Sequence, residues 1–468
     1  MRSLVWLICI ISMTSCGGGG SSSDQPAPAP VPASPKNPVS PVVPCTQPDC
    51  SAWQEATPAS VGMDSVKLNA AFDYAFGDGS FTQAAVIIKD NKLIKERYRG
   101  ILDGELTTVT SSLGLDATIT NGIFGNKDKD SLASSWSTAK SFTSVLVGIA
   151  LEQGFITSLS ESASVYITEW AYDERATITL RQLLDMRSGM PTVCFDQTTR
   201  SLGTCTTAEG SGGSLVFSNN QMDACLAREL AETGVIQPWY SSIKVYQAGA
   251  WLYSNCDTMV IGEILYRATG KDLETYADIN LFSKLGITAH WWQDNDSTDQ
   301  VDGNYLAYCC LDMTPRDFAK FGQLLLNNGV WNEEQVLPSS YVDKIKNITA
   351  DSQVAEYNGA ISYGLKFWTI GSITQPDGTI FPDANTIYST IGFDGQYIMI
   401  DFENNMVVTR NSLYQPVLNG SGERKMAITA AGIAQSDFVA TLPQGTGVSA
   451  NSNFSPANFL YRVNQAIQ

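Results

Sequence analysis

Histidine is almost absent from this sequence of 468 residues, which contains only His290. A single histidine excludes zinc sites built on two or three histidines and leaves histidine-based general-base chemistry to one residue. The G-x-S-x-G turn that carries the nucleophile of many Ser-His-Asp hydrolases is also missing. We therefore interpret His290 as a packing or loop residue, and we expect neither a metal nor a cofactor.

Basic residues are also few. The chain has 29 Lys and Arg against 47 Asp and Glu, which gives a net charge of -18. Phosphate contacts need Lys and Arg, so this chain is a poor candidate for binding nucleic acid. Apolar residues make up 43% of the sequence, enough for a large core, which excludes global disorder. We expect a small-molecule partner.

The apolar run at the N-terminus, Leu4 to Ile11, is too short to span a bilayer and is typical of a secretory signal. Small residues directly before Cys16 resemble a bacterial lipobox, which predicts a signal peptide over 1–15 and a lipid on Cys16. Gly17 then favours the outer membrane. We expect an exported lipoprotein that faces the periplasm or the cell surface; the alternative is a cleaved signal with an incidental cysteine.

Residues 16–52 are rich in Gly, Ser, Pro and Ala, which predicts an extended tether before a globular domain over 53–468. Without Cys9 and Cys16, eight cysteines remain, and an even number in an oxidising compartment indicates disulfides. The local pairs Cys45–Cys50 and Cys194–Cys205 are the simplest, and the other pairings stay open. A zinc site is the alternative, although no C-x-x-C pair exists.

The globular part begins and ends with strand patterns and has helical patterns between them. Two strands are expected over 84–98 around Asp90-Asn91, and another hairpin over 396–402 and 406–411. Helices are expected over 64–76, 138–153 and 455–466. The first should place one set of residues on its buried side: Val66, Leu68, Ala71, Phe72 and Ala75. The pattern predicts one sheet built from both termini and interrupted by a helical insertion.

Ser137 and Lys140 stand at the start of the expected helix over 138–153, which is apolar on nearly every side. A spacing of three residues puts the hydroxyl and the amine on one helix face. A desolvated lysine has a lowered pKa and can act as the base that a serine nucleophile needs. A second S-x-x-K match, Ser241 to Lys244, is not followed by a long apolar helical pattern, and we interpret it as a surface segment.

Two further segments accompany this pair. Tyr253-Ser254-Asn255 is the only Tyr-x-Asn in the chain, and a tyrosine near a lysine can relay protons. Residues 392–396, Gly-Phe-Asp-Gly-Gln, lead into an expected strand.

In this order the segments resemble the serine β-lactamase and penicillin-binding-protein superfamily, closest to class C-type hydrolases similar to 6-aminohexanoate-dimer hydrolase. Supporting stretches lie at 135–142, 180–189, 291–292 and 313–322. The resemblance covers about 53–468 and implies an α/β (α+β) β-lactamase-like fold. That fold has an antiparallel sheet flanked by helices, from about 53–136 and 355–468, and a mostly helical insertion over about 137–354.

The resemblance also implies roles for individual residues. Ser137 would be the acylated nucleophile, with Lys140 and Tyr253 as general base. Asn255 would bind substrate, as would the third motif, Phe393-Asp394-Gly395. The backbone N–H groups of Ser137 and Gln396 would form the oxyanion hole.

The third motif departs from the pattern of this superfamily, because Phe393 and Asp394 stand where a Lys or His is usual. The cation that would hold the carboxylate of a β-lactam is therefore absent, which weakens antibiotic hydrolysis but not acyl transfer. Asp394 either adds negative charge to the site or is a turn residue that points to solvent. Cys309-Cys310 also replaces a Gly-rich stretch.

We expect an exported serine hydrolase, an esterase or amidase, that forms an acyl-enzyme from a small amide or ester. The alternative is a catalytically weak or inactive binding or sensor lipoprotein with the same fold.

Overall fold

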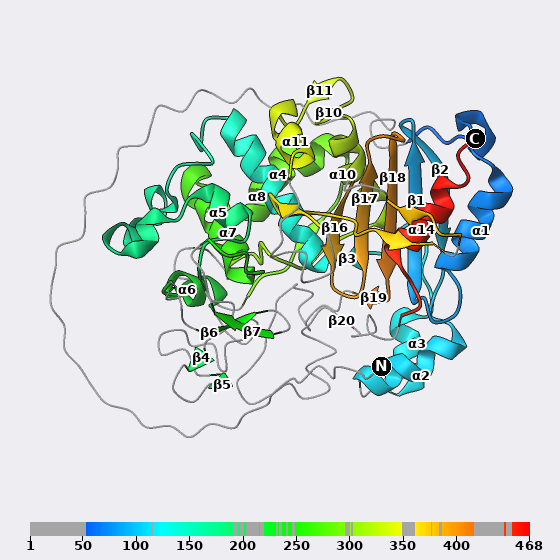
Figure 1. Ribbon diagram of the computed structural model, residues 1–468, viewed down its shortest axis with the longest axis horizontal. Helices are drawn as coiled ribbons and strands as arrows, with labels where there is room; N and C mark the ends of the chain where they lie inside the picture. The colour runs from blue at the N-terminus through cyan, green and yellow to red at the C-terminus, as the bar shows by residue number, and fades with distance from the viewer. Residues whose placement is uncertain are drawn as a thin grey trace. The chain divides into compact units, whose positions relative to one another are not determined.

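A seven-stranded antiparallel sheet joins the two ends of the globular part in the computed structural model of the protein (Figure 1). The pairing of β1 with β18 connects the N-terminal hairpin to the C-terminal strands, as the strand patterns predict. The strands, in spatial order, are β12 (Tyr363–Gly364), β13 (Phe367–Thr369), β16 (Ile387–Gly392), β17 (Gln396–Asp401), β18 (Met406–Ser412), β1 (Thr82–Lys89) and β2 (Lys92–Tyr98).

The structure describes residues 53–113, 116–190, 220–230, 249–294, 303–348, 361–375, 377–382, 386–415 and 452–468, with short pieces at 195–196, 201–202, 215, 233, 236–239, 242–245, 300 and 444–445. All of them belong to one compact unit, residues 44–468. The predicted signal peptide, the tether, Cys16 and the proposed Cys45–Cys50 and Cys194–Cys205 pairs lie outside the described residues.

Both expected hairpins are present. Asp90 and Asn91 join β1 to β2 with φ angles of 51° and 62°, the left-handed conformation that the tightest hairpin turns require. The second hairpin joins β17 to β18 through residues 402–405. These turns explain why short sequence patterns located the strands.

Helices cover both faces of the sheet. On one face α1 (Ser65–Ala75) and α14 (Pro456–Asn464) pack together and against Ala85 and Ile87 of β1. On the other face α10 (Pro315–Leu326) joins the core that contains Val86 and Ile88. Because both faces are covered, every residue of β1 is buried.

The prediction for α1 is confirmed except for one residue. Asp64 caps the helix by accepting hydrogen bonds from the backbone N–H groups of Val66 and Lys67. Val66 was expected on the buried side but is 75% exposed. The buried residues recur at the helical spacing from Leu68 onward, and Val66 precedes Leu68 by two positions, which places it on the opposite side.

The helix predicted over 138–153 is α4 (Ala139–Glu152), and it is buried as its composition indicates. The described ranges also contain α2 (Asp103–Leu113), α3 (Ala117–Phe124), α5 (Leu180–Leu184), α6 (Gln221–Leu226), α7 (Asn255–Thr269), α8 (Leu273–Ala277), α9 (Ser283–Leu285) and α11 (Ser339–Lys346). A small sheet pairs β3 (Ala133–Ser134), β9 (Leu311–Met313) and β8 (His290–Trp291). Its strand β3 directly precedes the segment with Ser137.

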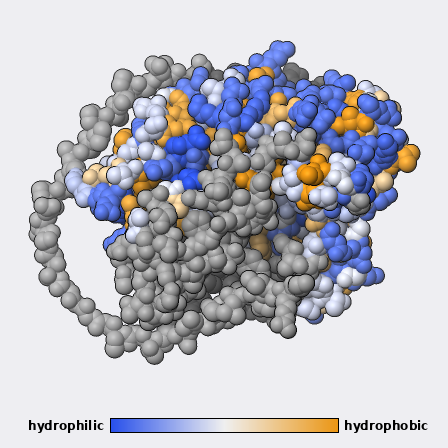
Figure 2. Space-filling model, in the orientation of Figure 1, coloured by the Kyte–Doolittle hydropathy of each residue, from blue (hydrophilic) through white to orange (hydrophobic). Residues whose placement is uncertain are grey.

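Hydrophilic residues cover much of the described surface on the face drawn in Figure 2, with apolar residues in small scattered groups. Phe393 is among the few large apolar side chains that are exposed. Within the described ranges, no helix combines the length and the apolar character needed to cross a bilayer. The same ranges contain no group of three or more His, Cys, Asp or Glu residues placed to hold a metal ion.

Candidate active site

Ser137 lies in a short 3-10 turn, Trp136–Thr138, that leads directly into α4. Trp136 has a φ of 46°, a left-handed conformation that costs a residue with a Cβ about 1–2 kcal/mol. Thr138 fixes the turn from the other side, because its hydroxyl donates to the carbonyl oxygen of Gln396 at 3.1 Å. The sheet therefore holds the serine at the N-terminal end of a buried helix.

Lys140 lies next to this serine and is only 1% exposed. Its Nζ atom is 2.9 Å from the Oγ atom of Ser137 and 2.9 Å from the carbonyl oxygen of Tyr308, to which it donates. Burial holds the pKa of Lys140 well below its usual range, and the positive charge of Lys366 lowers it further. A neutral amine within hydrogen-bond distance of a serine hydroxyl is suited to remove its proton.

Tyr253 lies near the same amine, with the Lys140 Nζ atom 4.9 Å from the centre of its ring. The ring belongs to an aromatic cluster and lies 5.7 Å from Trp368 and 6.1 Å from Trp251. The structure thus brings Ser137, Lys140 and Tyr253 together from two segments of the chain. Asn255 is two residues further on, half-buried, at the first position of α7.

The third motif forms the turn between β16 and β17, beside the serine turn. The ring of Phe393 meets the ring of Trp136 edge-on at 5.4 Å, and Phe393 is 39% exposed. Gly392 approaches the serine turn so closely that a Cβ atom on it would lie 2.2 Å from the carbonyl oxygen of Ser135. A glycine is required there, because any side chain would push the motif away from Ser137.

Asp394 is 3% exposed, so the interpretation of this residue as a turn residue that points to solvent is wrong. The reason is Arg410 of β18, which is buried beneath the turn and donates to the carbonyl oxygens of Asp394 and Gly395 at 3.0 and 2.8 Å. Burial lowers the pKa of Arg410 to about 10, while the negative charge of Asp394 opposes that shift. The charge of Asp394 is therefore offset by a neighbouring cation.

Gln396, the expected second donor of the oxyanion hole, begins β17 and is 1% exposed. Its side-chain oxygen accepts hydrogen bonds from the side chain of Asn411 and the backbone N–H of Ser412. Its carbonyl oxygen is the acceptor for Thr138, so its main chain lies beside the start of α4. The role of Gln396 and of Ser137 as oxyanion donors stays a prediction.

A second group of charged residues, the buried Lys366 and Asp257 with the partly buried Asp185, lies near Lys140. Lys366, in the turn between β12 and β13, donates to the carbonyl oxygen of Leu183 at 2.6 Å. Burial lowers its pKa, and Asp257 and Asp185 oppose that shift. Burial likewise raises the pKa of Asp257, while the charge of Lys366 counteracts it. This pair places a positive charge close enough to Lys140 to influence its protonation.

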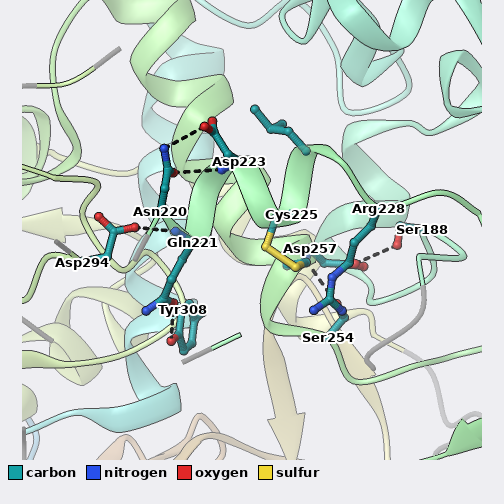
Figure 3. Close-up of a disulfide and its surroundings, with 12 residues drawn as sticks. Ser188, Asn220, Gln221, Asp223, Cys225, Arg228, Ser254, Asp257, Asp294 and Tyr308 are labelled. Atoms are coloured by element: carbon teal, nitrogen blue, oxygen red, sulfur yellow. Dashed lines mark hydrogen bonds between the residues drawn. A yellow bond between two sulfur atoms is a disulfide. The ribbon is translucent and has the colours of Figure 1, made fainter. Parts of the chain in front are cut away.

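Asp257 is anchored within the first turn of α7 (Figure 3). The Ser188 hydroxyl donates a hydrogen bond to its carboxylate at 2.7 Å. The side chain of Ser254, the N-cap of the helix, accepts a hydrogen bond from the backbone N–H of Asp257. A disulfide between Cys225 and Cys256 ties the same turn to α6. These contacts fix the start of α7, which carries Asn255 and follows Tyr253.

The sequence motifs do not indicate three residues of the site: Tyr308, Lys366 and Arg410. Lys366 and Arg410 had a detectable signal, since each is a lone cation within a run of strand-forming residues. Tyr308 acts through its backbone carbonyl, which no residue type reveals. His290 lies in β8 with its Nδ1 atom 3.9 Å from the carboxylate of Glu274.

The beta-lactamase family model matches residues 82–431, and the chain therefore belongs to the beta-lactamase family. Among solved structures, a Bacillus anthracis protein assigned as a 6-aminohexanoate-dimer hydrolase is 21% identical, with a TM-score of 0.53 and 89% of each chain covered. A penicillin-binding-protein homologue from Caulobacter crescentus is 11% identical, with a TM-score of 0.52, covering 85% of this chain and 97% of that one. No curated protein matches the chain.

Family and fold together support an acyl-enzyme serine hydrolase in general. The prediction of a mixed helix and antiparallel-sheet fold of the β-lactamase type is confirmed.

Proposed function

We propose that the protein is an exported serine hydrolase that cleaves an amide or ester bond through an acyl-enzyme on Ser137, with Lys140 and Tyr253 as the general base. One observation carries the proposal: the buried amine of Lys140, whose pKa is lowered, lies 2.9 Å from the hydroxyl oxygen of Ser137. A lysine whose pKa is lowered by burial can serve as the general base for a serine, the role that histidine has in other hydrolases.

In the acylation step, Lys140 Nζ accepts the hydroxyl proton of Ser137 while Oγ bonds to the substrate carbonyl carbon. The electron pair of the carbonyl bond moves to oxygen, which we assign to the backbone N–H groups of Ser137 and Gln396. Collapse of this intermediate breaks the bond to the leaving amine or alcohol. The leaving group takes the proton from the Lys140 ammonium, relayed by Tyr253.

In the deacylation step, water replaces the leaving group. Lys140 and Tyr253 accept a proton from the water as its oxygen attacks the acyl carbon, and the bond to Ser137 Oγ then breaks. Oγ takes the proton back and the free acid leaves. The same groups serve both steps, because each step is the reverse of the other in its proton transfers.

We infer small substrates without a negative charge beside the scissile bond. Phe393 and Trp136 offer an aromatic surface at the site, and the amide of Asn255 can bind a substrate carbonyl. Short linear amides and esters are therefore the first substrates to test, and the likeness to the Bacillus anthracis protein adds linear amides of the 6-aminohexanoate-dimer type. We propose that the enzyme is held at the outer membrane by a lipid on Cys16.

A fluorophosphonate serine probe gives the direct test. We expect the wild-type protein to be labelled and the Ser137→Ala variant to remain unlabelled. Labelling should be followed by turnover assays on the predicted globular domain, residues 53–468, with esters, linear amides and nitrocefin as substrates. A folded protein that neither takes the probe nor turns over any substrate would instead support the binding or sensor role.

A further inference from the structure

The segment Tyr308-Cys309-Cys310-Leu311 contacts the chain on both sides of Ser137, at Lys140 and at Ser135. At one end, the carbonyl oxygen of Tyr308 accepts the hydrogen bond from Lys140. At the other, the backbone N–H of Leu311 donates to the Oγ atom of Ser135 at 2.9 Å, and the carbonyl oxygen of Leu311 accepts a hydrogen bond from the backbone N–H of Ser135 at 2.8 Å. Between the two ends lies a disulfide that joins the adjacent residues Cys309 and Cys310.

The segment is held firmly on its far side as well. The indole N–H of Trp291 donates to the carbonyl oxygen of Cys309 at 3.0 Å, and the backbone N–H of Trp292 donates to that of Cys310 at 2.9 Å. The hydroxyl of Tyr308 donates to Gln221 at 2.8 Å. Both cysteines are 1% exposed or less, so the ring is part of the core and not a surface feature.

The backbone at Cys310 has a φ of 66°, which residues with a Cβ rarely adopt. Closing a ring between adjacent side chains removes most of the other conformations that this peptide could take, in the unfolded as well as the folded chain. The ring can therefore hold a turn that an unlinked pair of cysteines would disfavour.

We propose that the Cys309–Cys310 disulfide is a positioning element of the hydrolase site, which fixes the Tyr308 carbonyl so that the lone pair of Lys140 points at the Ser137 hydroxyl. A neutral lysine has two N–H bonds and one lone pair. When one N–H is held by Tyr308, rotation of the amine is restricted and the lone pair can be aimed at Oγ. The inference rests on the proposed function.

Several other groups influence the charge of Lys140, and the experiment must leave them in place. Lys366 acts on it directly, and Asp257 and Asp185 act on Lys366. The rings of Tyr253 and Tyr308 lie 4.9 and 5.3 Å from the Nζ atom. None of these side chains changes when the ring is opened.

The test is the double variant Cys309→Ala/Cys310→Ala, compared with Val463→Ala, which shortens a fully buried side chain of α14 in the separate core between α1, α14 and the sheet. We expect opening the 309–310 ring to lower kcat at pH 7 by about tenfold or more, with KM changed by less than about twofold. The loss should shrink toward about pH 9, because a loosened lysine that meets water needs a higher pH to become neutral. The comparison variant should lose stability and keep the wild-type pH profile.

A kcat and a pH profile equal to those of the wild type would overturn the inference. So would alkylation of Cys309 and Cys310 in the denatured, unreduced wild-type protein. If the double variant does not fold, Cys309→Ala alone opens the ring with the loss of one sulfur atom, and the same two outcomes apply. Turnover by Ser137→Ala would overturn the proposed function instead, so the two failures are distinguishable.

Discussion

The Nζ atom of Lys140 lies 2.9 Å from the Oγ atom of Ser137, and the two residues belong to different kinds of helix. Ser137 is in a 3-10 turn, whereas Lys140 is in the first turn of α4. The tight turn keeps the serine at the edge of the site, half-buried, while the lysine enters the core. One side chain can meet a substrate and the other is kept away from water, which a serine–lysine pair requires.

Replacing Ser137 by Ala should abolish turnover and leave the protein folded. The hydroxyl provides the covalent step, and its loss from a half-buried position should cost about 1 kcal/mol or less in the free energy of unfolding. Steady-state rates and a thermal melt measure both effects. Ser241→Ala, which removes the serine of the second S-x-x-K match, is the control and should retain wild-type rates. Near-wild-type turnover by Ser137→Ala would remove the nucleophile assignment.

Lys140→Ala and Tyr253→Phe should each slow acylation by about 100-fold or more, the usual scale for the loss of general-base help. The double variant should be little slower than the worse single variant, because both residues serve one proton transfer. Pre-steady-state acylation with an activated ester measures this. Fully additive losses would show that one of the two residues acts independently of the other.

The parts of the fold that local patterns specify could be predicted from the sequence. Asp90-Asn91 marks a hairpin because a two-residue turn needs φ above zero, and α4 is recognisable because a helix apolar on all sides has to be buried. Ser137 and Lys140 were predictable for a similar reason, since three residues of helix bring them together.

The contacts made across long sequence separations were not predictable. Lys366 reaches the site from a turn between two short strands, and Arg410 supports the third motif from the next strand of the sheet. The pairing of Cys225 with Cys256 depends on how α6 packs on α7. No local spacing encodes any of these, because each follows from the way distant elements are packed. The burial of Asp394 belongs with these contacts, because Arg410 of β18 lies against its turn.

The activity should depend on pH through Lys140. Only the neutral amine can accept the Ser137 proton, so kcat/KM should rise with pH and level off well below the pH at which an ordinary lysine titrates. Lys366→Met should move this rise to higher pH, because the positive charge of Lys366 lowers the pKa of Lys140.

At pH 7 the Lys366→Met variant should therefore lose about tenfold in kcat/KM and recover most of it in alkaline buffer. Lys366→Arg keeps the charge and should keep the midpoint, while Lys344→Met changes an exposed lysine and should have no effect. A loss that is equal at every pH would show that Lys366 supports packing and not protonation.

Removing the Cys225–Cys256 disulfide should lower stability. The bond closes a segment with a sequence separation of 31, for which loop entropy gives about 3–4 kcal/mol. We expect Cys225→Ser/Cys256→Ser to lose about 2–4 kcal/mol of unfolding free energy in urea. The wild type with reductant should lose at least as much, because reductant also opens the Cys309–Cys310 ring. Two free thiols at these positions in the denatured, unreduced protein would contradict the prediction.

The charge of the substrate should influence the rate of hydrolysis. Phe393 is 39% exposed, the most exposed residue of the third motif, and its ring lies against Trp136, the neighbour of Ser137. Asp394 is buried with Arg410 beside it, so it should repel an anionic substrate only weakly. The discrimination against anionic substrates should therefore come mainly from the absence of a cation at this turn. Wild-type enzyme should therefore prefer neutral esters to carboxylated esters of the same shape.

Phe393→Lys should narrow that preference, because it places an ammonium group at the edge of the site. An attraction between partly solvated unit charges contributes about 1 kcal/mol, which is about fivefold in kcat/KM for the carboxylated ester relative to the neutral one. Val66→Lys adds the same charge at a site on α1 that is 75% exposed and should leave the ratio unchanged. The gain should also fall as salt is added, since screening weakens an exposed pair. If Phe393→Lys and Val66→Lys change the ratio of kcat/KM for the carboxylated and neutral esters equally, this turn does not discriminate between substrates by charge.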